Sequence, residues 1–417
     1  MMEMPGVVSD VVRSVGLSTA MRAAGVVTGL LPIPQPLLLV GPGASRRLGQ
    51  VLCGMGHNKI LIVTDRVVAG MGLPDALIKA LSEGGIAHVV FDAVTPDAPI
   101  PVIEKGIAFF NKHRCDAIVA FGGGSPMDVA KTIALAVANK KHPSKLVGYF
   151  KGLRAPVPIY AVPTTAGTGS EVTVAAVISD PATNRKLVIA DTRLVPTMAA
   201  LDPTLMVRLP RNVTAATGMD ALTHAIEAFV GHWSNTHTDR MALAAVGMIY
   251  GNLRIACRNG RNLAAREQMS LAATYAGIAF TRANVGYVHA IAHQLGGKYH
   301  TPHGLANAMV LPHVLRFLSP AITKKLAVLA VRAGVGREGE RPAALAKKFI
   351  DSVDALNRDL GIPLQLSTLR EADVPELAKA ACWEADTNYP VPRYMSPKIC
   401  EGIIRQLLPK ATRRQRN

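Results

Sequence analysis

The stretch AIVAFGGGSPMDVAKTIALAVA, residues 117–138, decides the fold class, because it runs from an apolar strand through three glycines into a helix. Glycines let a backbone approach a pyrophosphate closely, and the N–H groups at a helix start attract its charge. Ser125 can cap this helix, Pro126 suits its first position, and Asp128 sits where a capping-box acid would. Three glycines exceed what an ordinary strand-to-helix turn needs. The stretch therefore predicts nucleotide binding, although it is not the GxGxxG fingerprint of Rossmann domains.

Outward from this stretch, the first half of the chain alternates between apolar runs and helical segments. The runs that predict strands are residues 59–65, 87–92, 116–124, 158–165 and 198–203. Such alternation predicts a mainly parallel, Rossmann-like sheet with helices on both faces. Two further apolar segments, VTVAAVISD and RKLVIAD, flank PATN and predict a β-hairpin.

A second glycine-rich turn, PTTAGTGSEVT at residues 163–173, offers small hydroxyls and backbone amides but no P-loop lysine. Open α/β sheets bind ligands at the carboxyl ends of their strands, so two such turns together favour a nucleotide site. Asp65 closes the first predicted strand, where a carboxylate can bind an adenosine ribose and repel a 2′-phosphate. Arg66 can soften that discrimination, and a plain surface pair of Asp65 and Arg66 is an equally good interpretation.

The second half of the chain has a different texture. From about Arg211, segments such as NVTAATGMDALTHAIEAFV have helical spacing and few β-branched runs. We therefore expect an N-terminal extension and a dinucleotide-binding α/β domain over residues 1–210, followed by an all-helical domain over residues 211–417.

Histidines gather in this helical half. Asp220 and His224 are four residues apart on a predicted helix, so both side chains project from one face. His289 and His293 have the same spacing, and His303 follows a Gly-Gly pair and a proline, where the chain must turn back. Neutral imidazoles and a carboxylate are good ligands for a divalent transition metal. A metal site is therefore predicted here.

Composition narrows the class of protein. The chain has 417 residues, 49% hydrophobic and 18% charged, with five scattered cysteines that form no CxxC pair. A disulfide framework is therefore not expected, and a reducing, cytoplasmic location fits best. The net charge of +17 is dispersed apart from the tail KATRRQRN, which argues against a nucleic-acid partner. No apolar run is long enough for a membrane span. The first 40 residues are expected to pack on the body or on a second subunit.

Four motifs together resemble the group III, iron-dependent alcohol dehydrogenases. They are GGGSPMDVAK, PTTAGTGSEVT, GMDALTHAIEA and HAIAHQLGGKYHTPHGLANAMVLPHV, and the resemblance runs from GPGA at residue 41 to PVPRYMS at residue 396. It implies a metal-dependent, NAD(H)-linked alcohol dehydrogenase or aldehyde reductase, with the active site in the cleft between an α/β domain and a helical domain. It also implies Fe²⁺ or Zn²⁺, a small alcohol or aldehyde as substrate, and a homodimer.

The resemblance also implies roles for single residues. The metal ligands would be Asp220, His224, His289 and His303. His293 would instead lie beside the nicotinamide as the catalytic proton relay, whereas spacing alone pairs it with His289 as a ligand. His300 has no family role and is expected to face solvent. The residues that match the cofactor site are Asp65, Gly122, Gly123, Gly124, Ser125, Thr164, Thr165, Thr168 and Lys186, and Asp128 is counted with them. Asp97 stands where many relatives have Asn.

Three alternative functions remain open at this point. A hydroxyacid–oxoacid transhydrogenase would keep its nicotinamide bound and would need an arginine for a carboxylate. An enzyme similar to dehydroquinate synthase would need several basic residues for a phosphorylated acid, whereas the metal motifs are rich in Ala, Gly and Leu. A non-catalytic metal-binding or nucleic-acid-binding protein is the least favoured.

Overall fold

The computed structural model describes residues 21, 25, 31–183 and 185–409. Its contacts divide the chain into two compact units. The sheet unit comprises residues 31–214 and 255–281, and the helical unit comprises residues 215–254, 282–417 and those up to 30. The assignment of separate functions to residues 1–210 and 211–417 stays a prediction.

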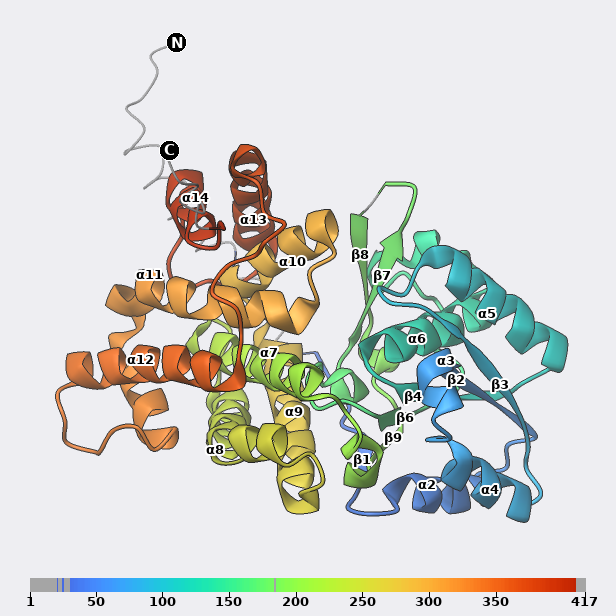
Figure 1. Cartoon of the computed structure of the whole chain (residues 1–417). Coiled ribbons are helices and arrows are strands. Elements are labelled where there is room, and N and C mark those ends of the chain that lie inside the picture. Colours follow the sequence, from blue (N-terminus) through green and yellow to red (C-terminus); the bar gives the residue numbers. More distant parts are fainter. Residues whose placement is uncertain (1–20, 22–24, 26–30, 184, 410–417) are drawn as a thin grey trace, which may run out of the picture. The chain divides into compact units, whose positions relative to one another are not determined.

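A six-stranded parallel sheet forms the centre of the sheet unit, in the order β1-β9-β6-β4-β2-β3 (Figure 1). The strands are β1 (Leu37–Val40), β2 (Lys59–Asp65), β3 (Ala87–Val94), β4 (Ala117–Gly122), β6 (Ile159–Pro163) and β9 (Met198–Leu201). The mainly parallel sheet predicted from the sequence is therefore confirmed. One strand of this sheet, the edge strand β1, was not predicted. Since β1 precedes β2 in the chain, Asp65 closes the second strand and not the first.

Helices cover both faces of this sheet. They are α2 (Ala44–Cys53), α3 (Arg66–Gly70), α4 (Asp75–Glu83), α5 (Ile100–His113) and α6 (Gly124–Asn139). The central strand β4 shows why, since successive side chains of a strand point to opposite faces. Ile118 and Ala120 belong to the core under α5 and α6, whereas Val119 and Phe121 belong to the core under α2 and α4. A strand that is buried on both faces needs the unbroken apolar run seen in the sequence.

A small second sheet has the order β5-β8-β7. It consists of β5 (Gly148–Tyr149), β7 (Ala175–Asp180) and β8 (Arg185–Ala190). Strands β7 and β8 pair in antiparallel fashion, with Ala175 opposite Ala190 and Asp180 opposite Arg185, which confirms the predicted hairpin. Short 3-10 helices η1 (Pro143–Leu146), η2 (Ser170–Val172), η3 (Thr192–Leu194) and η4 (Pro203–Met206) lie in the connections.

Within the described residues, the chain after residue 210 is helical, as predicted. Its helices are α7 (Arg211–Val230), α8 (Thr236–Arg258), α9 (Leu263–Ala283), α10 (Tyr287–Tyr299), α11 (His303–Arg332), α12 (Pro342–Leu360), α13 (Val374–Asn388) and α14 (Pro397–Arg405), with the 3-10 helix η5 (Glu371–Asp373). Helix α11 is kinked at Ile322, two residues after Pro320, because proline removes a backbone hydrogen bond from the helix.

Much of the N-terminal arm lies outside the described residues, and so does the basic tail 410–417. Of the arm's first 30 residues only Met21 and Gly25 are described, and the Trp233 indole donates to the Met21 carbonyl at 2.8 Å. No helix within the described ranges has the length and apolar character to cross a membrane. The homodimer and the cytoplasmic location stay predictions.

Candidate active site

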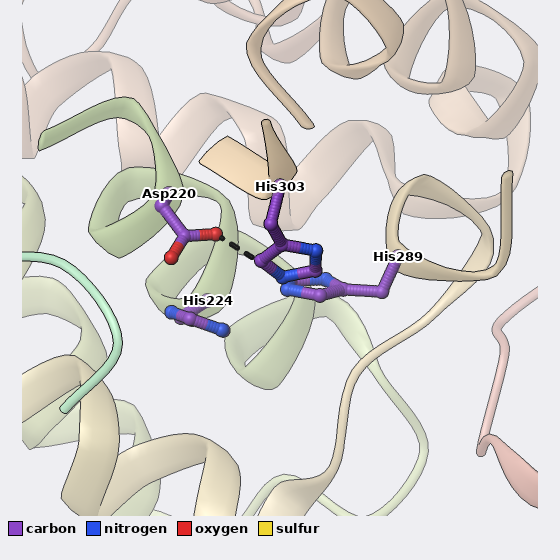
Figure 2. A group of neighbouring side chains, drawn as sticks. All are labelled: Asp220, His224, His289 and His303. Atoms are coloured by element: carbon purple, nitrogen blue, oxygen red, sulfur yellow. Dashed lines mark ion pairs between the residues drawn. The ribbon is translucent and has the colours of Figure 1, made fainter. Parts of the chain in front are cut away.

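Three helices of the helical unit bring one carboxylate and three imidazoles together (Figure 2). Asp220 and His224 project from α7, His289 from α10, and His303 from the first residue of α11. One ligand atom from each side chain lies within 4.8 Å of all the others. The Nε2 atom of His303 lies 3.5 Å from Oδ1 of Asp220. The four residues expected as metal ligands are therefore neighbours, with Asp220, His224 and His289 buried.

The turn between α10 and α11 places His303 in this group. Helix α10 ends at Tyr299, and His300 takes the left-handed conformation with φ of 53°. Pro302 then leads directly into α11 at His303. A Cβ atom on Gly304 would lie 2.3 Å from the Ala216 carbonyl oxygen, so only glycine lets the start of α11 approach the backbone of α7 this closely.

A buried carboxylate orients one of the imidazoles. Oε2 of Glu227 accepts the Nδ1 proton of His289 at 2.6 Å. The same carboxylate accepts the backbone N–H groups of Gly286 at 2.9 Å and Val288 at 2.8 Å. The Nδ1 hydrogen bond selects the tautomer in which Nε2 of His289 presents a lone pair toward Asp220 and His303. Such carboxylate–histidine pairs are typical of metal-binding histidines.

Burial also sets the charge states of this pair. It lowers the pKa of His289 well below its usual value, and the neighbouring imidazoles of His224 and His303 lower it further. His289 is therefore neutral at pH 7. Burial raises the pKa of Glu227 to about 7, and the amides of Val288 and Gly286 oppose this rise. A neutral imidazole is the form that binds a metal.

Asn307, one turn into α11, supports the same cluster. Its Nδ2 atom donates to Oδ1 of Asp220 at 2.7 Å and lies 3.2 Å from Nε2 of both His289 and His303. Three acceptor atoms thus converge on one small polar group. Together with the carboxylate and the neutral imidazole, this convergence of lone pairs fits a divalent transition metal such as iron or zinc.

His293 lies beside the cluster and has a different partner. Its ring is stacked on that of His303, with centroids 5.3 Å apart and an interplanar angle of 17°. Its Nδ1 atom donates to Glu384 of α13 at 2.6 Å. Glu384 also accepts from Gln294 at 2.8 Å and from Tyr389 at 2.6 Å. Glu384 therefore holds the His293 ring through Nδ1 and leaves Nε2 out of this contact. His300, for which no role was predicted, is exposed.

The first glycine-rich turn differs in detail from the sequence prediction. Helix α6 begins at Gly124 with Gly123 as its N-cap, and no described side chain caps it. The prediction that Ser125 caps the helix is therefore wrong, because the extended Gly123 lets the helix start earlier. Asp128 makes no capping box and instead accepts a hydrogen bond from the Ser170 hydroxyl at 3.3 Å. The uncapped start suits an anionic ligand.

The three glycines of this turn have different reasons to be glycine. Gly122 has φ of 151°, and a Cβ there would lie 2.6 Å from Cγ of Pro126. A Cβ on Gly124 would lie 3.0 Å from Cγ2 of Thr168. Gly123 has an ordinary extended backbone, and its Cβ would meet only Thr165, at 3.4 Å. Neither backbone strain nor a steric clash requires glycine at position 123, so it leaves open a space that a phosphate could approach.

Two other predicted cofactor residues, Thr164 and Asp65, lie at the same carboxyl edge of the six-stranded sheet. Gly122 ends β4 beside Pro163 of β6, and the Thr164 amide donates to the Gly122 carbonyl at 3.0 Å. Asp65 ends β2, the neighbour of β4 on the other side, and its Oδ1 atom caps α3 by accepting from the amides of Val67 and Val68.

Two predicted cofactor residues are positioned by contacts within the sheet unit. Oγ1 of Thr168 accepts from the Ser170 amide at 3.3 Å. Nζ of Lys186, on β8, lies 2.9 Å from Oδ1 of Asp97. Asp97 has φ of 65°, a conformation that Asn also tolerates well. Lys186 and Asp97 thus form an ion pair.

Several supporting residues were missed by the sequence analysis. Glu227 lies three residues after His224, and Asn307 four after His303, so helical spacing could have identified both. Glu384 is 91 positions from His293 and gives no local signal. Lys131 looks like an ordinary helix residue, although it is fully buried.

Comparison with known proteins gives a consistent result. The family model for "Iron-containing alcohol dehydrogenase" matches residues 36–203, and the model for "Fe-containing alcohol dehydrogenase family, C-terminal" matches residues 214–408. The chain is 41% identical over 371 residues to 1,3-propanediol dehydrogenase of Klebsiella pneumoniae, covering 88% of this chain and 95% of that protein. It is 39% identical over 375 residues to NAD-dependent methanol dehydrogenase of Bacillus methanolicus, covering 89% and 98%. A crystal structure of 1,3-propanediol oxidoreductase matches with a TM-score of 0.88 and 39% identity, covering 91% of this chain and all of that one.

The different constraints on the glycines lead to a paired prediction. Gly122→Ala should destabilise the protein by roughly 1–3 kcal/mol, because its backbone conformation and Pro126 both oppose a Cβ. Gly123→Ala should change the free energy of unfolding by less than about 0.5 kcal/mol yet weaken NADH binding by about tenfold or more. Chemical denaturation and NADH fluorescence titration measure the two effects. Unchanged NADH affinity in Gly123→Ala would contradict the phosphate-loop assignment.

Proposed function

The chain belongs to the iron-containing alcohol dehydrogenase family, and on that premise we propose that it interconverts small alcohols and aldehydes with NAD(H) as the hydride partner. The observation that supports this most directly is the group of Asp220, His224, His289 and His303, whose ligand atoms lie within 4.8 Å of one another. The names of two relatives, a propanediol dehydrogenase and an NAD-dependent methanol dehydrogenase, support a short primary alcohol as the substrate class.

We propose Asp220, His224, His289 and His303 as the ligands of a divalent ion, with iron as the first choice and zinc as the second. A bound ion of this kind supplies Lewis-acid chemistry, which lowers the pKa of an alcohol and polarises a carbonyl. The chain's own contribution is to hold the donors in the right form. Glu227 fixes the His289 tautomer, and Asn307 orients Asp220 through the 2.7 Å hydrogen bond.

His293 is the proposed catalytic acid–base residue. Alcohol oxidation releases a proton that a nearby side chain must accept, and imidazole is suited to this near neutral pH. Glu384 acts as a positioning residue, because it accepts a hydrogen bond from Nδ1 of His293 and so leaves Nε2 for proton exchange. The stacking of His293 on His303 keeps the ring next to the ligand group without making it a ligand.

The two glycine-rich turns are the proposed NAD site. The nicotinamide, when bound, accepts or donates the hydride. The uncapped start of α6 and the open space at Gly123 would receive the pyrophosphate. Asp65 would favour NAD over NADP, since a carboxylate repels a 2′-phosphate. Ser125, Asp128, Thr164, Thr165, Thr168 and Lys186 complete the proposed set.

The central experiment is a panel of alcohols with NAD and of aldehydes with NADH, using protein purified without air or chelator. Turnover of short primary alcohols is the expected result. A protein that exchanges hydride between a hydroxyacid and an oxoacid without free NAD, or that turns over a phosphorylated acid, would contradict the proposal. Elemental analysis of the same preparation identifies the metal.

Replacing a proposed ligand should empty the metal site. We expect His289→Ala to lose bound metal and activity together while NADH still binds, because the glycine-rich turns are untouched. His300→Asn is the matched control, since His300 is exposed and Asn suits its left-handed conformation. Elemental analysis and NADH titration give the result. A full metal equivalent in His289→Ala would remove it from the ligand set.

Replacing His293 should separate chemistry from metal binding. We expect His293→Ala to keep its metal and its NADH affinity while kcat falls by roughly 10²–10⁴-fold, the usual contribution of a positioned acid–base group. Metal content, NADH affinity and kcat are measured on one preparation. If His293→Ala loses metal as completely as His289→Ala, then His293 is a ligand and the spacing-based interpretation was right.

Cofactor preference can be tested without disturbing α3. Asp65→Ser keeps a side-chain oxygen that can accept the amides of Val67 and Val68, but it removes the negative charge. We expect the ratio of kcat/KM for NAD over NADP to fall by about tenfold or more, which corresponds to ~1.4 kcal/mol. An unaltered protein that already prefers NADP would show that Arg66 dominates.

A further inference from the structure

A buried ammonium group lies behind the two glycine-rich turns. Among the residues that the structure describes, Lys131 on α6 is the only buried lysine, with no exposed surface. Taking a charged ammonium out of water costs several kcal/mol unless its protons are hydrogen-bonded and its charge is balanced. A lysine in this position therefore needs a reason, and its contacts supply one.

All hydrogen bonds of Lys131 go to the second glycine-rich turn and the strand after it. Its Nζ atom donates to the Thr173 carbonyl at 2.8 Å, to Oγ1 of Thr173 at 3.0 Å, and to Oγ of Ser170 at 3.2 Å. A fourth contact reaches the Ala175 carbonyl at 3.0 Å. Two of these acceptors are backbone carbonyls, so Lys131 fixes the backbone of this segment as well as its side chains.

Two buried carboxyl groups lie close to Lys131, and burial raises the pKa of both, that of Asp128 to about 7. Asp128, one turn earlier on α6, accepts from the Ser170 hydroxyl at 3.3 Å. Glu171 is buried in the turn itself and accepts from the Thr274 hydroxyl of α9 at 2.7 Å. Burial lowers the pKa of Lys131, and both carboxylates oppose that effect. The ammonium form offers three protons to the four oxygen atoms around Nζ, two of which are the carbonyls of Thr173 and Ala175.

The segment that Lys131 fastens also positions Thr168. The Thr168 hydroxyl accepts from the backbone amide of Ser170, and the hydroxyl of the same Ser170 accepts from Lys131. A methyl group of Thr168 packs so closely on Gly124 that a Cβ there would approach it to 3.0 Å. The first and second glycine-rich turns therefore meet at Thr168 and Gly124. Lys131 fixes the position of the second turn relative to the first through its hydrogen bonds to Ser170 and Thr173.

We propose that Lys131 is a positioning residue for NAD, which assembles the two glycine-rich turns into one cofactor cradle without touching the cofactor itself. The turn PTTAGTGSEVT lacks a P-loop lysine, and in this protein Lys131 of helix α6 holds it through hydrogen bonds. The inference rests on the proposed function, because it assumes that these turns bind NAD.

The test compares NADH affinity, metal content and kinetics in metal-loaded enzyme. Lys131→Met keeps an unbranched side chain that is one atom shorter, and it removes the ammonium group with its protons and charge. We expect its Kd for NADH to rise by on the order of tenfold or more, with KM for NAD rising in parallel, kcat much less affected and metal content unchanged. Lys105→Met, at an exposed position on α5, is the matched control and should behave like the unaltered enzyme.

A milder variant guards against a general folding defect. Thr173→Val removes one hydroxyl acceptor of Lys131 and keeps the shape and the backbone carbonyl, so we expect a Kd for NADH about threefold higher, a factor worth less than one hydrogen bond to a charged group. If Lys131→Met loses metal as well, Thr173→Val decides the question. Unaltered NADH affinity in Thr173→Val would then overturn the inference.

Two further outcomes separate the inference from the proposed function. Lower thermal stability in Lys131→Met with an unaltered Kd would show that the lysine is only structural, which overturns the inference and leaves the proposed function standing. An unaltered enzyme that binds no NADH, measured by fluorescence titration, would overturn both.

Discussion

The candidate metal site depends on one constraint, which is that several lone pairs must face one point inside a buried space. An imidazole can present one nitrogen inward only if its other nitrogen finds a partner, and Glu227 is that partner for His289. Glu227 is in turn held by the amides of Gly286 and Val288 at the start of α10. One buried carboxylate thus ties α7 to α10, the helices that contribute three of the four proposed ligands. Glu227 therefore both positions the start of α10 and fixes the tautomer of His289.

In the sheet unit, the three consecutive glycines 122–124 look equivalent in the sequence but have different structural roles. Gly122 permits the sharp change of direction between β4 and α6, and Gly124 permits the contact with Thr168. Only Gly123 is free of such demands. Because Gly122 and Gly124 are explained by the fold, their presence says little about a ligand. Gly123 and the uncapped start of α6 are therefore the features of this turn that favour a phosphate site.

The sequence predicted those features whose causes are local. Apolar runs bounded by turn residues identified β2 and β4, and the four-residue spacing of Asp220 and His224 placed both on one helix face. The edge strand β1 was missed because its four residues, LLLV, form only a short apolar run between Pro36 and Gly41 at the end of the N-terminal arm. The partner of His293 was missed because Glu384 comes from α13, and no spacing rule connects residues that only tertiary packing brings together. Lys131 was missed because a lysine on a helix normally lies at the surface, and nothing in the local sequence indicates that this one is buried.

Composition also conceals which helices serve the sheet. The described elements after residue 210 are all helices, yet residues 255–281 belong by their contacts to the sheet unit. The reason is a close approach of two backbones, because Gly169 in the second glycine-rich turn and Gly277 on α9 each leave no room for a Cβ against the other. Gly169 also has φ of 61°, which a side chain would strain. With Thr274 bound to Glu171 beside this contact, α9 supports the turn from one side while Lys131 of α6 holds it from another. The second glycine-rich turn is therefore a braced segment of the fold and not a loose loop, which is the property that a preorganised cofactor site requires.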